Sequence, residues 1–146
     1  MDWNDIHSPI SKHFIVKDAL WLPKWNRAAT VADNLTDEYR SNLVTLFSKM
    51  DIVRDFIGLP IVSIVSFRPT QYNTLIHGAT NSAHLYGMAL DFYVQGHTGV
   101  SGCDKIRKLI VPMLEAWDMR CENISGDWIH MDTREPEPGG RRFFVP

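Results

Sequence analysis

Apolar residues recur at spacings of three and four between Thr36 and Gly58, which is the period of an amphipathic α-helix. Thr36 suits the N-cap, and Asp37 and Glu38 suit the positive end of the helix dipole. Gly58 followed by Pro60 favours an end to the helix at that point. We therefore expect one long helix with a buried face. The residues of that face are Tyr39, Leu43, Leu46, Phe47, Met50, Val53 and Phe56.

The rest of the chain alternates between strand-like and helix-like patterns. Short apolar runs at 61–67 and 88–94 predict two strands, and 101–117 predicts a second long helix. In that helix Ser101 and Asp104 have the spacing of a capping box, and Pro112 predicts a kink. The other expected elements are a short helix or irregular arm at 11–25, a two-turn helix at 70–78, two short strands around a turn at Ser125-Gly126, and a last strand at 141–145. This order predicts an α+β fold, with helices on one face of a mainly antiparallel sheet, in a single domain spanning residues 1–146.

Composition narrows the classes of function. The chain has 146 residues, 45% hydrophobic and 22% charged, with a net charge of −2. A balance of this kind does not favour electrostatic capture of nucleic acid or of an anionic membrane, and no apolar run predicts membrane insertion. The first residues lack the basic and apolar blocks of a signal peptide, so we expect synthesis in the cytoplasm, with release, if any, by another route. We expect a monomer in which Cys103 and Cys121 are reduced and packed.

Two polar residues interrupt the second predicted strand and the turn before it. Asp91 lies inside the strand, where side chains alternate, so Leu90 and Phe92 face the opposite side. An unpaired carboxylate in a half-buried strand is costly, and no Lys or Arg lies within ten residues of Asp91. A metal ion with His84 as a second ligand is one solution. The other is a distant arginine for Asp91, with His84 as an ordinary surface histidine.

The stretch "SGDWIHMD", residues 125–132, strengthens the metal hypothesis. On a strand, Trp128, His130 and Asp132 share one face, opposite Ile129 and Met131. Two histidines and one carboxylate form a familiar catalytic zinc set that leaves one position open. Asp127 follows Gly126 and is expected in the turn before the strand. There it could act as a base rather than a ligand, or simply form the turn.

At this point the sequence resembles a known family. "SAHLYGMALD" matches the pattern SxHxxGxAxD of the zinc D-Ala-D-Ala carboxypeptidases and related cell-wall peptidases, in the lysostaphin/D-Ala-D-Ala-peptidase/Hedgehog fold group. The matching residues are Ser82, His84, Gly87, Ala89 and Asp91. The family's acid-x-x-His motif is matched by residues 127–130, with Asp127 where many members have Glu. Its arginine after a strand is matched by Arg68. The stretch "NTLIHGATNSAH" resembles the phage and bacterial branch, and the similarity extends from about Ser11 to His130.

The resemblance implies a Hedgehog/D-Ala-D-Ala-peptidase-like fold and one Zn²⁺ per chain, held by His84, Asp91 and His130. It also implies that Asp127 is the base that takes the proton of the attacking water, and that Arg68 polarises the scissile carbonyl or holds a substrate carboxylate. Ser82, Tyr86 and Trp128 are further candidates for substrate binding, although a turn or packing role explains them as well.

The implied substrate is a peptide of bacterial peptidoglycan, cut by a D-Ala-D-Ala carboxypeptidase or an L-Ala-D-Glu type endopeptidase. A phage-type lysin or a wall-cutting protein of a virion fits the absence of a signal peptide. Two alternatives remain open. One is a zinc-binding recognition domain without catalysis, and the other is a cytoplasmic dipeptidase or carboxypeptidase.

Overall fold

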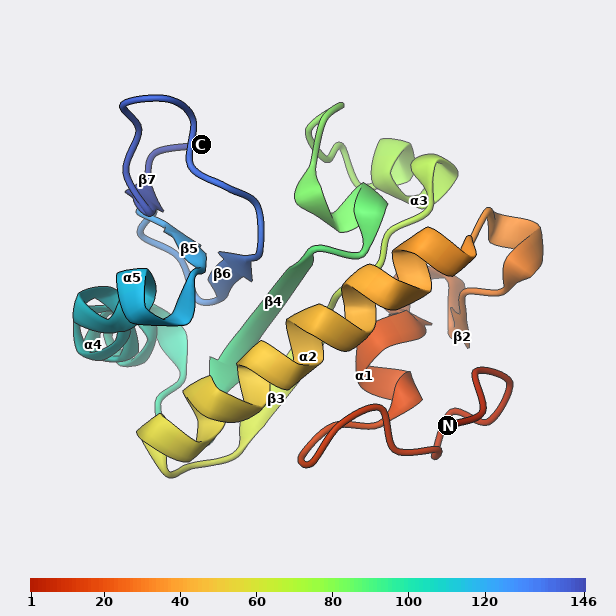
Figure 1. Cartoon of the computed structure of the whole chain (residues 1–146), viewed down its shortest axis with the longest axis horizontal. Coiled ribbons are helices and arrows are strands. Elements are labelled where there is room, and N and C mark those ends of the chain that lie inside the picture. The colour runs from red at the N-terminus through yellow and green to blue at the C-terminus, as the bar shows by residue number, and fades with distance from the viewer.

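A five-stranded sheet lies at the centre of the computed structural model, which describes residues 1–146 (Figure 1). Its strands are β3 (Ile61–Val65), β4 (Ala89–Val94), β5 (Arg120–Glu122), β6 (Ile129–Asp132) and β7 (Phe143–Phe144). Their order is β3-β4-β6-β5-β7, and every neighbouring pair is antiparallel except β5 and β7, which are parallel. The predicted α+β class with a mainly antiparallel sheet is confirmed.

The longest helix is α2 (Asp37–Ile57), which crosses β3 and β4 diagonally (Figure 1). It begins as the sequence predicts, because the Thr36 hydroxyl accepts a hydrogen bond from the Tyr39 amide at 3.2 Å. It ends at Gly58, whose φ of 76° is left-handed. No helix of the chain combines the length and the apolar character that a membrane span requires.

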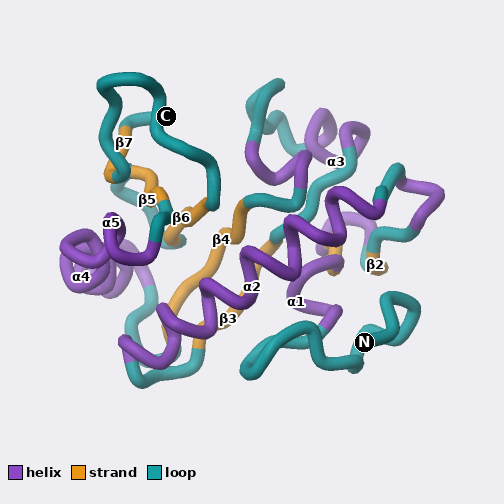
Figure 2. The backbone as a smooth tube through the Cα atoms, in the orientation of Figure 1, coloured by secondary structure: helices purple, strands orange, loops and turns teal.

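Smaller elements surround this framework. The N-terminal segment runs mostly as loop into α1 (Val16–Leu20), which precedes a small hairpin of β1 (Trp21–Leu22) and β2 (Arg27–Ala28) (Figure 2). The predicted helix at 70–78 is shorter, α3 (Thr70–Leu75). The chain also has four short 3-10 helices: η1 (Pro23–Trp25), η2 (Val31–Asp33), η3 (Ala83–Tyr86) and η4 (Val111–Met113).

The second long helix differs from its prediction at both ends. Helix α4 (Gly99–Ile110) begins two residues early, with Thr98 as its N-cap, so the predicted capping box of Ser101 and Asp104 is wrong. The Asp104 carboxylate instead accepts a hydrogen bond from Arg107 at 2.8 Å, one turn further along the helix. Pro112 lies in η4, which separates α4 from α5 (Leu114–Trp117), because proline cannot continue the hydrogen-bond ladder.

The sheet has a core face and an open face. Leu90 and Phe92 are fully buried in the same cluster as residues of α2 and α4. Asp91 lies between them on the other face of β4, as the alternation predicts. The register pairs Leu90 with Met131 on the core face and Asp91 with His130 on the open face. Two candidate ligands are therefore neighbours on adjacent strands, although they are far apart in sequence.

Candidate metal centre

His84 is held rigidly behind the open face of the sheet. It lies in η3 and is fully buried. Its Nδ1 lies 2.6 Å from the Ser66 carbonyl oxygen, and since a carbonyl only accepts, Nδ1 carries the proton and donates. The lone pair of Nε2 is then directed at Asp91, 3.1 Å from Oδ1. Backbone hydrogen bonding has thus selected one ring nitrogen of His84 for ligation.

Gly87 explains why the turn between His84 and β4 needs glycine. Its φ is +69°, a left-handed conformation in which side chains are strained. A Cβ atom at this position would also lie 2.7 Å from the backbone oxygen of Tyr39 in α2. The turn is therefore packed directly on the helix, and this contact fixes where His84 lies relative to Asp91.

The structure brings His84, Asp91 and His130 together. Asp91 Oδ1 lies 2.9 Å from His130 Nδ1, and one ligand atom from each of the three residues falls within 4.8 Å of the others. Two imidazole nitrogens and one carboxylate oxygen suit zinc, with a fourth position left for water or substrate. The donor set and its convergence therefore fit the metal that the sequence pattern implies.

Burial and hydrogen bonding set the charges of these three side chains. Burial lowers the pKa of His84, although the charge of Asp91 acts in the opposite direction. The lowered pKa favours the neutral imidazole that a metal needs. Burial works to raise the pKa of Asp91, but His84 and His130 together hold it well below its usual range. Burial works to lower the pKa of His130, but hydrogen bonds to Asp132 and Asp91 raise it to about 9. In the metal-free protein at neutral pH, a proton therefore sits on His130 Nδ1, where the metal would bind.

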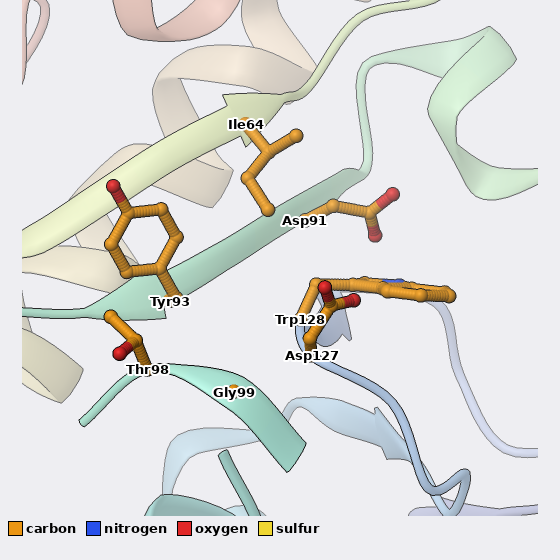
Figure 3. Close-up of a pocket in the computed structure, with 7 residues that line it drawn as sticks. All are labelled: Ile64, Asp91, Tyr93, Thr98, Gly99, Asp127 and Trp128. Atoms are coloured by element: carbon orange, nitrogen blue, oxygen red, sulfur yellow. The ribbon is translucent and has the colours of Figure 1, made fainter. Parts of the chain in front are cut away.

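A cavity of about 530 Å³ opens beside Asp91 (Figure 3). Asp127 and Trp128, from the turn before β6, line it across from Ile64 and Tyr93. Asp127 is exposed, and the indole of Trp128 is 37% exposed, so both side chains are accessible to a ligand in the cavity. Two of the predicted site residues thus share one cavity with a candidate metal ligand.

Arg107 of α4 holds the turn that carries Asp127. This buried guanidinium donates from Nη1 to the Trp128 carbonyl at 2.7 Å and from Nη2 to the Gly126 carbonyl at 2.9 Å. It also pairs with Asp104 on its own helix. Because the two carbonyls flank Asp127, the clamp fixes the backbone on both sides of that residue.

Arg68 contacts the segment that carries His84. Its backbone amide donates to the His84 carbonyl at 3.0 Å, and its Nη2 donates to the Ser82 hydroxyl at 3.2 Å. Ser82 also caps η3 by accepting from the His84 amide at 3.3 Å. Burial lowers the pKa of Arg68, against the opposing charges of Asp91 and Glu122, but arginine stays charged. Its Nε is buried and has no hydrogen-bond partner in the protein.

Tyr86, like Arg68 and Ser82, does not line the cavity beside Asp91. Its ring packs edge-on against Tyr39 at 5.9 Å, and the guanidinium of Arg134 lies over it at 5.2 Å. It lines a separate cavity together with Tyr39 and Asp33, and not the cavity that contains Asp91. These contacts describe a packing role for Tyr86.

Glu122 is a carboxylate near the metal centre that sequence reasoning missed. Its Oε1 lies 3.9 Å from His130 Nε2. Burial raises the pKa of Glu122, and the charges of Asp91 and Asp132 add to this effect, while His130 opposes it. No motif includes Glu122, because its approach to His130 depends on how β5 and β6 pair. Alternation within β5, which places Arg120 and Glu122 on one face, is the only sequence signal for it.

Comparison with known proteins agrees with this geometry. A family model for Peptidase M15 matches residues 16–132, which include every strand of the central sheet except β7 and all three candidate ligands. Searches among curated proteins and among solved structures gave no match. Peptidases of this family depend on zinc, and the His84, Asp91 and His130 cluster has the donors to hold it. The chain belongs to the Peptidase M15 family.

Proposed function

We propose that this chain is a zinc metallopeptidase that hydrolyses the stem peptides of bacterial peptidoglycan. The observation that carries the proposal is the convergence of His84, Asp91 and His130 beside a cavity that also contains Asp127. His84, Asp91 and His130 would hold the metal, and Asp91 also lines the cavity that a peptide could enter.

The chemistry needs an activated water and a group to accept its proton. Zinc, when bound, lowers the pKa of a coordinated water from 15.7 to about 7. Asp127 is our first candidate for the base, because it is exposed inside the cavity and its backbone is clamped by Arg107. Such a base contributes roughly 10²–10⁴-fold to rate. Glu122 is the second candidate, because it is partly shielded from water and lies close enough to Asp91 and Arg68 for their charges to shift its pKa.

The charge and shape of the site support this substrate class. Wall stem peptides contain D-amino acids and free carboxylates, and the guanidinium of Arg68 suits a carboxylate or a developing oxyanion. Trp128, Tyr93 and Ile64 offer apolar surface for a side chain of the peptide. Both a D-Ala-D-Ala carboxypeptidase and an L-Ala-D-Glu type endopeptidase fit these features. The resemblance of residues 73–84 to the phage and bacterial branch supports a role as a phage-type lysin or virion wall-cutting protein.

A digest of purified peptidoglycan fragments by the zinc-loaded protein, read by mass spectrometry, tests the function and identifies the bond. We expect the Asp127→Ala variant to keep its zinc and its melting temperature, but to lose on the order of 10²-fold or more in cleavage. Glu137→Gln, at an exposed residue outside the site, is the matched control and should cleave as wild type.

The same digest with Glu122→Gln distinguishes the two carboxylates. A large loss in Glu122→Gln with normal cleavage by Asp127→Ala would move the role of base to Glu122. If Asp127→Ala loses its zinc, Asp127 is a ligand. If wild type holds zinc and cleaves no wall peptide of any stem composition, the non-catalytic zinc-binding domain is the better description.

A further inference from the structure

A buried carboxylate lies directly behind His130, on the side away from the metal position. Asp132 is fully buried. Its Oδ2 lies 2.9 Å from His130 Nε2, and Arg120 donates from Nε to Oδ1 at 2.7 Å and from Nη2 to Oδ2 at 2.9 Å. The Arg134 amide donates to Oδ1 at 3.1 Å. Both oxygens of Asp132 are therefore occupied, and the carboxylate cannot rotate.

We propose that Asp132 and Arg120 are positioning residues that fix His130 for metal binding through Nδ1. The proposal rests on the metal centre described above. A carboxylate only accepts hydrogen bonds, so the proton on the His130 side of the contact belongs to Nε2. In the neutral ring, the lone pair then lies on Nδ1, which faces Asp91. Arg120 keeps Asp132 in place, and Asp132 sets the ring's tautomer and its angle.

Phe144, in the C-terminal strand β7, packs against the residues that hold His130. The Arg120 guanidinium lies 4.1 Å from the centre of the Phe144 ring, and the same ring lies edge-on to His130 at 6.5 Å. Strand β7 is joined to β5 by hydrogen bonds from the Cys121 amide to the Arg142 carbonyl at 2.8 Å and from the Asn123 amide to the Phe144 carbonyl at 2.7 Å. Phe144 thus covers one face of the Arg120 guanidinium.

Strand β7 lies outside the residues that match the family model. The family match ends at Asp132, whereas β7 begins at Phe143. Arg142 anchors the strand by pairing with Glu115 at 2.8 Å and Asp118 at 3.0 Å. We therefore assign to the C-terminal strand a part in shaping the metal centre, transmitted through Arg120.

A purely structural ion pair is the competing explanation, and it makes a different prediction. Such a pair would lower the melting temperature of the metal-free protein when disrupted, but would leave the zinc affinity of the folded protein unchanged. A positioning pair lowers the affinity itself. Loss of such a supporting contact typically weakens metal binding by about 10- to 100-fold.

The test measures the zinc dissociation constant by competition with a chelator, at a temperature where the metal-free form of each variant is folded. Asp132→Asn removes the negative charge and replaces one accepting oxygen by an NH₂ group, so the donors to either Oδ1 or Oδ2 lose their acceptor. Arg120→Lys keeps the charge but loses the two-pronged contact. Phe144→Ala removes the aromatic ring that packs on the Arg120 guanidinium. Val145→Ala, at a residue 77% exposed, is its matched control.

We expect Asp132→Asn and Arg120→Lys to weaken zinc binding by about 10- to 100-fold, Phe144→Ala to weaken it less, and Val145→Ala to leave it unchanged. In zinc-loaded wild type, ¹⁵N-resolved NMR of His130 should show the proton on Nε2. Affinities within threefold of wild type in both Asp132→Asn and Phe144→Ala overturn the proposal, even if Arg120→Lys does not fold. A proton on Nδ1 also overturns it.

These outcomes are separable from the proposed function. If wild type binds zinc but cleaves no peptide, the function fails while the comparison of affinities still decides the positioning role. If the variants bind zinc like wild type and wild type cleaves, the function stands and the positioning role fails. A wild type that takes up no zinc overturns both.

Discussion

Lowering the pH from 9 to 6 should weaken zinc binding, because zinc and a proton compete for Nδ1 of His130. Burial works to lower the pKa of His130, but hydrogen bonds to Asp132 and Asp91 raise it to about 9. Below that pH the metal-free protein carries the proton at the ligand position. The ordinary pKa of histidine is near 6.5, so protonated His130 stabilises the metal-free fold fully below pH 6.5, and this contribution is lost as the pH rises through 9.

The size of the effect follows from the pKa. Each unit of pH below 9 costs zinc binding about 1.4 kcal/mol, or tenfold in affinity, because one proton must be displaced. Between pH 9, where His130 is half protonated, and pH 7 the apparent dissociation constant should rise about 50-fold. His84 adds nothing to this slope, because burial lowers its pKa despite the opposing charge of Asp91 and favours the neutral ring before zinc arrives.

Isothermal titration at pH 6 in buffers of different ionisation enthalpy measures the proton release directly. A coordinated water titrates near pH 7, so at pH 6 the released proton comes mainly from His130. We expect about one proton per zinc in wild type and in His7→Gln, a control at an exposed histidine far from any motif. No proton release, with an affinity that stays flat from pH 6 to pH 8, would refute the argument that His130 carries a proton at the ligand position in the metal-free protein.

Three further predictions follow from the site and the turn that carries it. Purified protein should hold about one zinc per chain by elemental analysis, and His84→Ala should lose most of it and melt at a lower temperature, since metal bound to the folded state stabilises it. Arg68→Lys should fold and bind zinc normally but show a lower kcat/KM on wall peptides, because an ammonium cannot reproduce the guanidinium fork; an unchanged value would reduce Arg68 to a structural residue. Gly87→Ala should lower the free energy of unfolding by about 2–4 kcal/mol in urea titrations, from left-handed strain plus the clash with Tyr39, whereas Gly96→Ala, with φ of +81° and open space, should lose only about 1–2 kcal/mol. Equal losses would mean that packing against α2 does not matter.

Patterns that depend on local physics were predictable from the sequence. Helix α2 has both its caps and its apolar period within one segment, so Thr36 and Gly58 mark its ends correctly. The alternation along β4 placed Asp91 opposite Leu90 and Phe92 without any knowledge of neighbouring strands. Each of these features is decided by the residue itself and by the few residues around it.

Features that depend on pairing between distant segments were not predictable. The approach of Glu122 to His130 requires the register of β5 against β6, which pairs Cys121 with Met131. The parallel β7 joins the sheet after a loop, and nothing in "RRFFV" indicates its partner or its direction. The predicted capping box of Ser101 and Asp104 is wrong for a local reason, because α4 begins at Gly99 and both residues lie inside the helix, where Asp104 accepts from Arg107.

The role of Asp127 shows how these two levels combine. A three-residue spacing to His130 is a local fact, but by itself it describes a flexible acid beside a glycine. Arg107, from helix α4, donates hydrogen bonds to the carbonyls on both sides of Asp127 and so holds the backbone there. A carboxylate exposed in the cavity on a backbone held in this way suits the role of base that we propose for Asp127. Glu122, in contrast, is partly shielded from water and lies close to His130. Because Asp127 and Glu122 differ in this way, comparing cleavage by Asp127→Ala with cleavage by Glu122→Gln shows which carboxylate acts as the base.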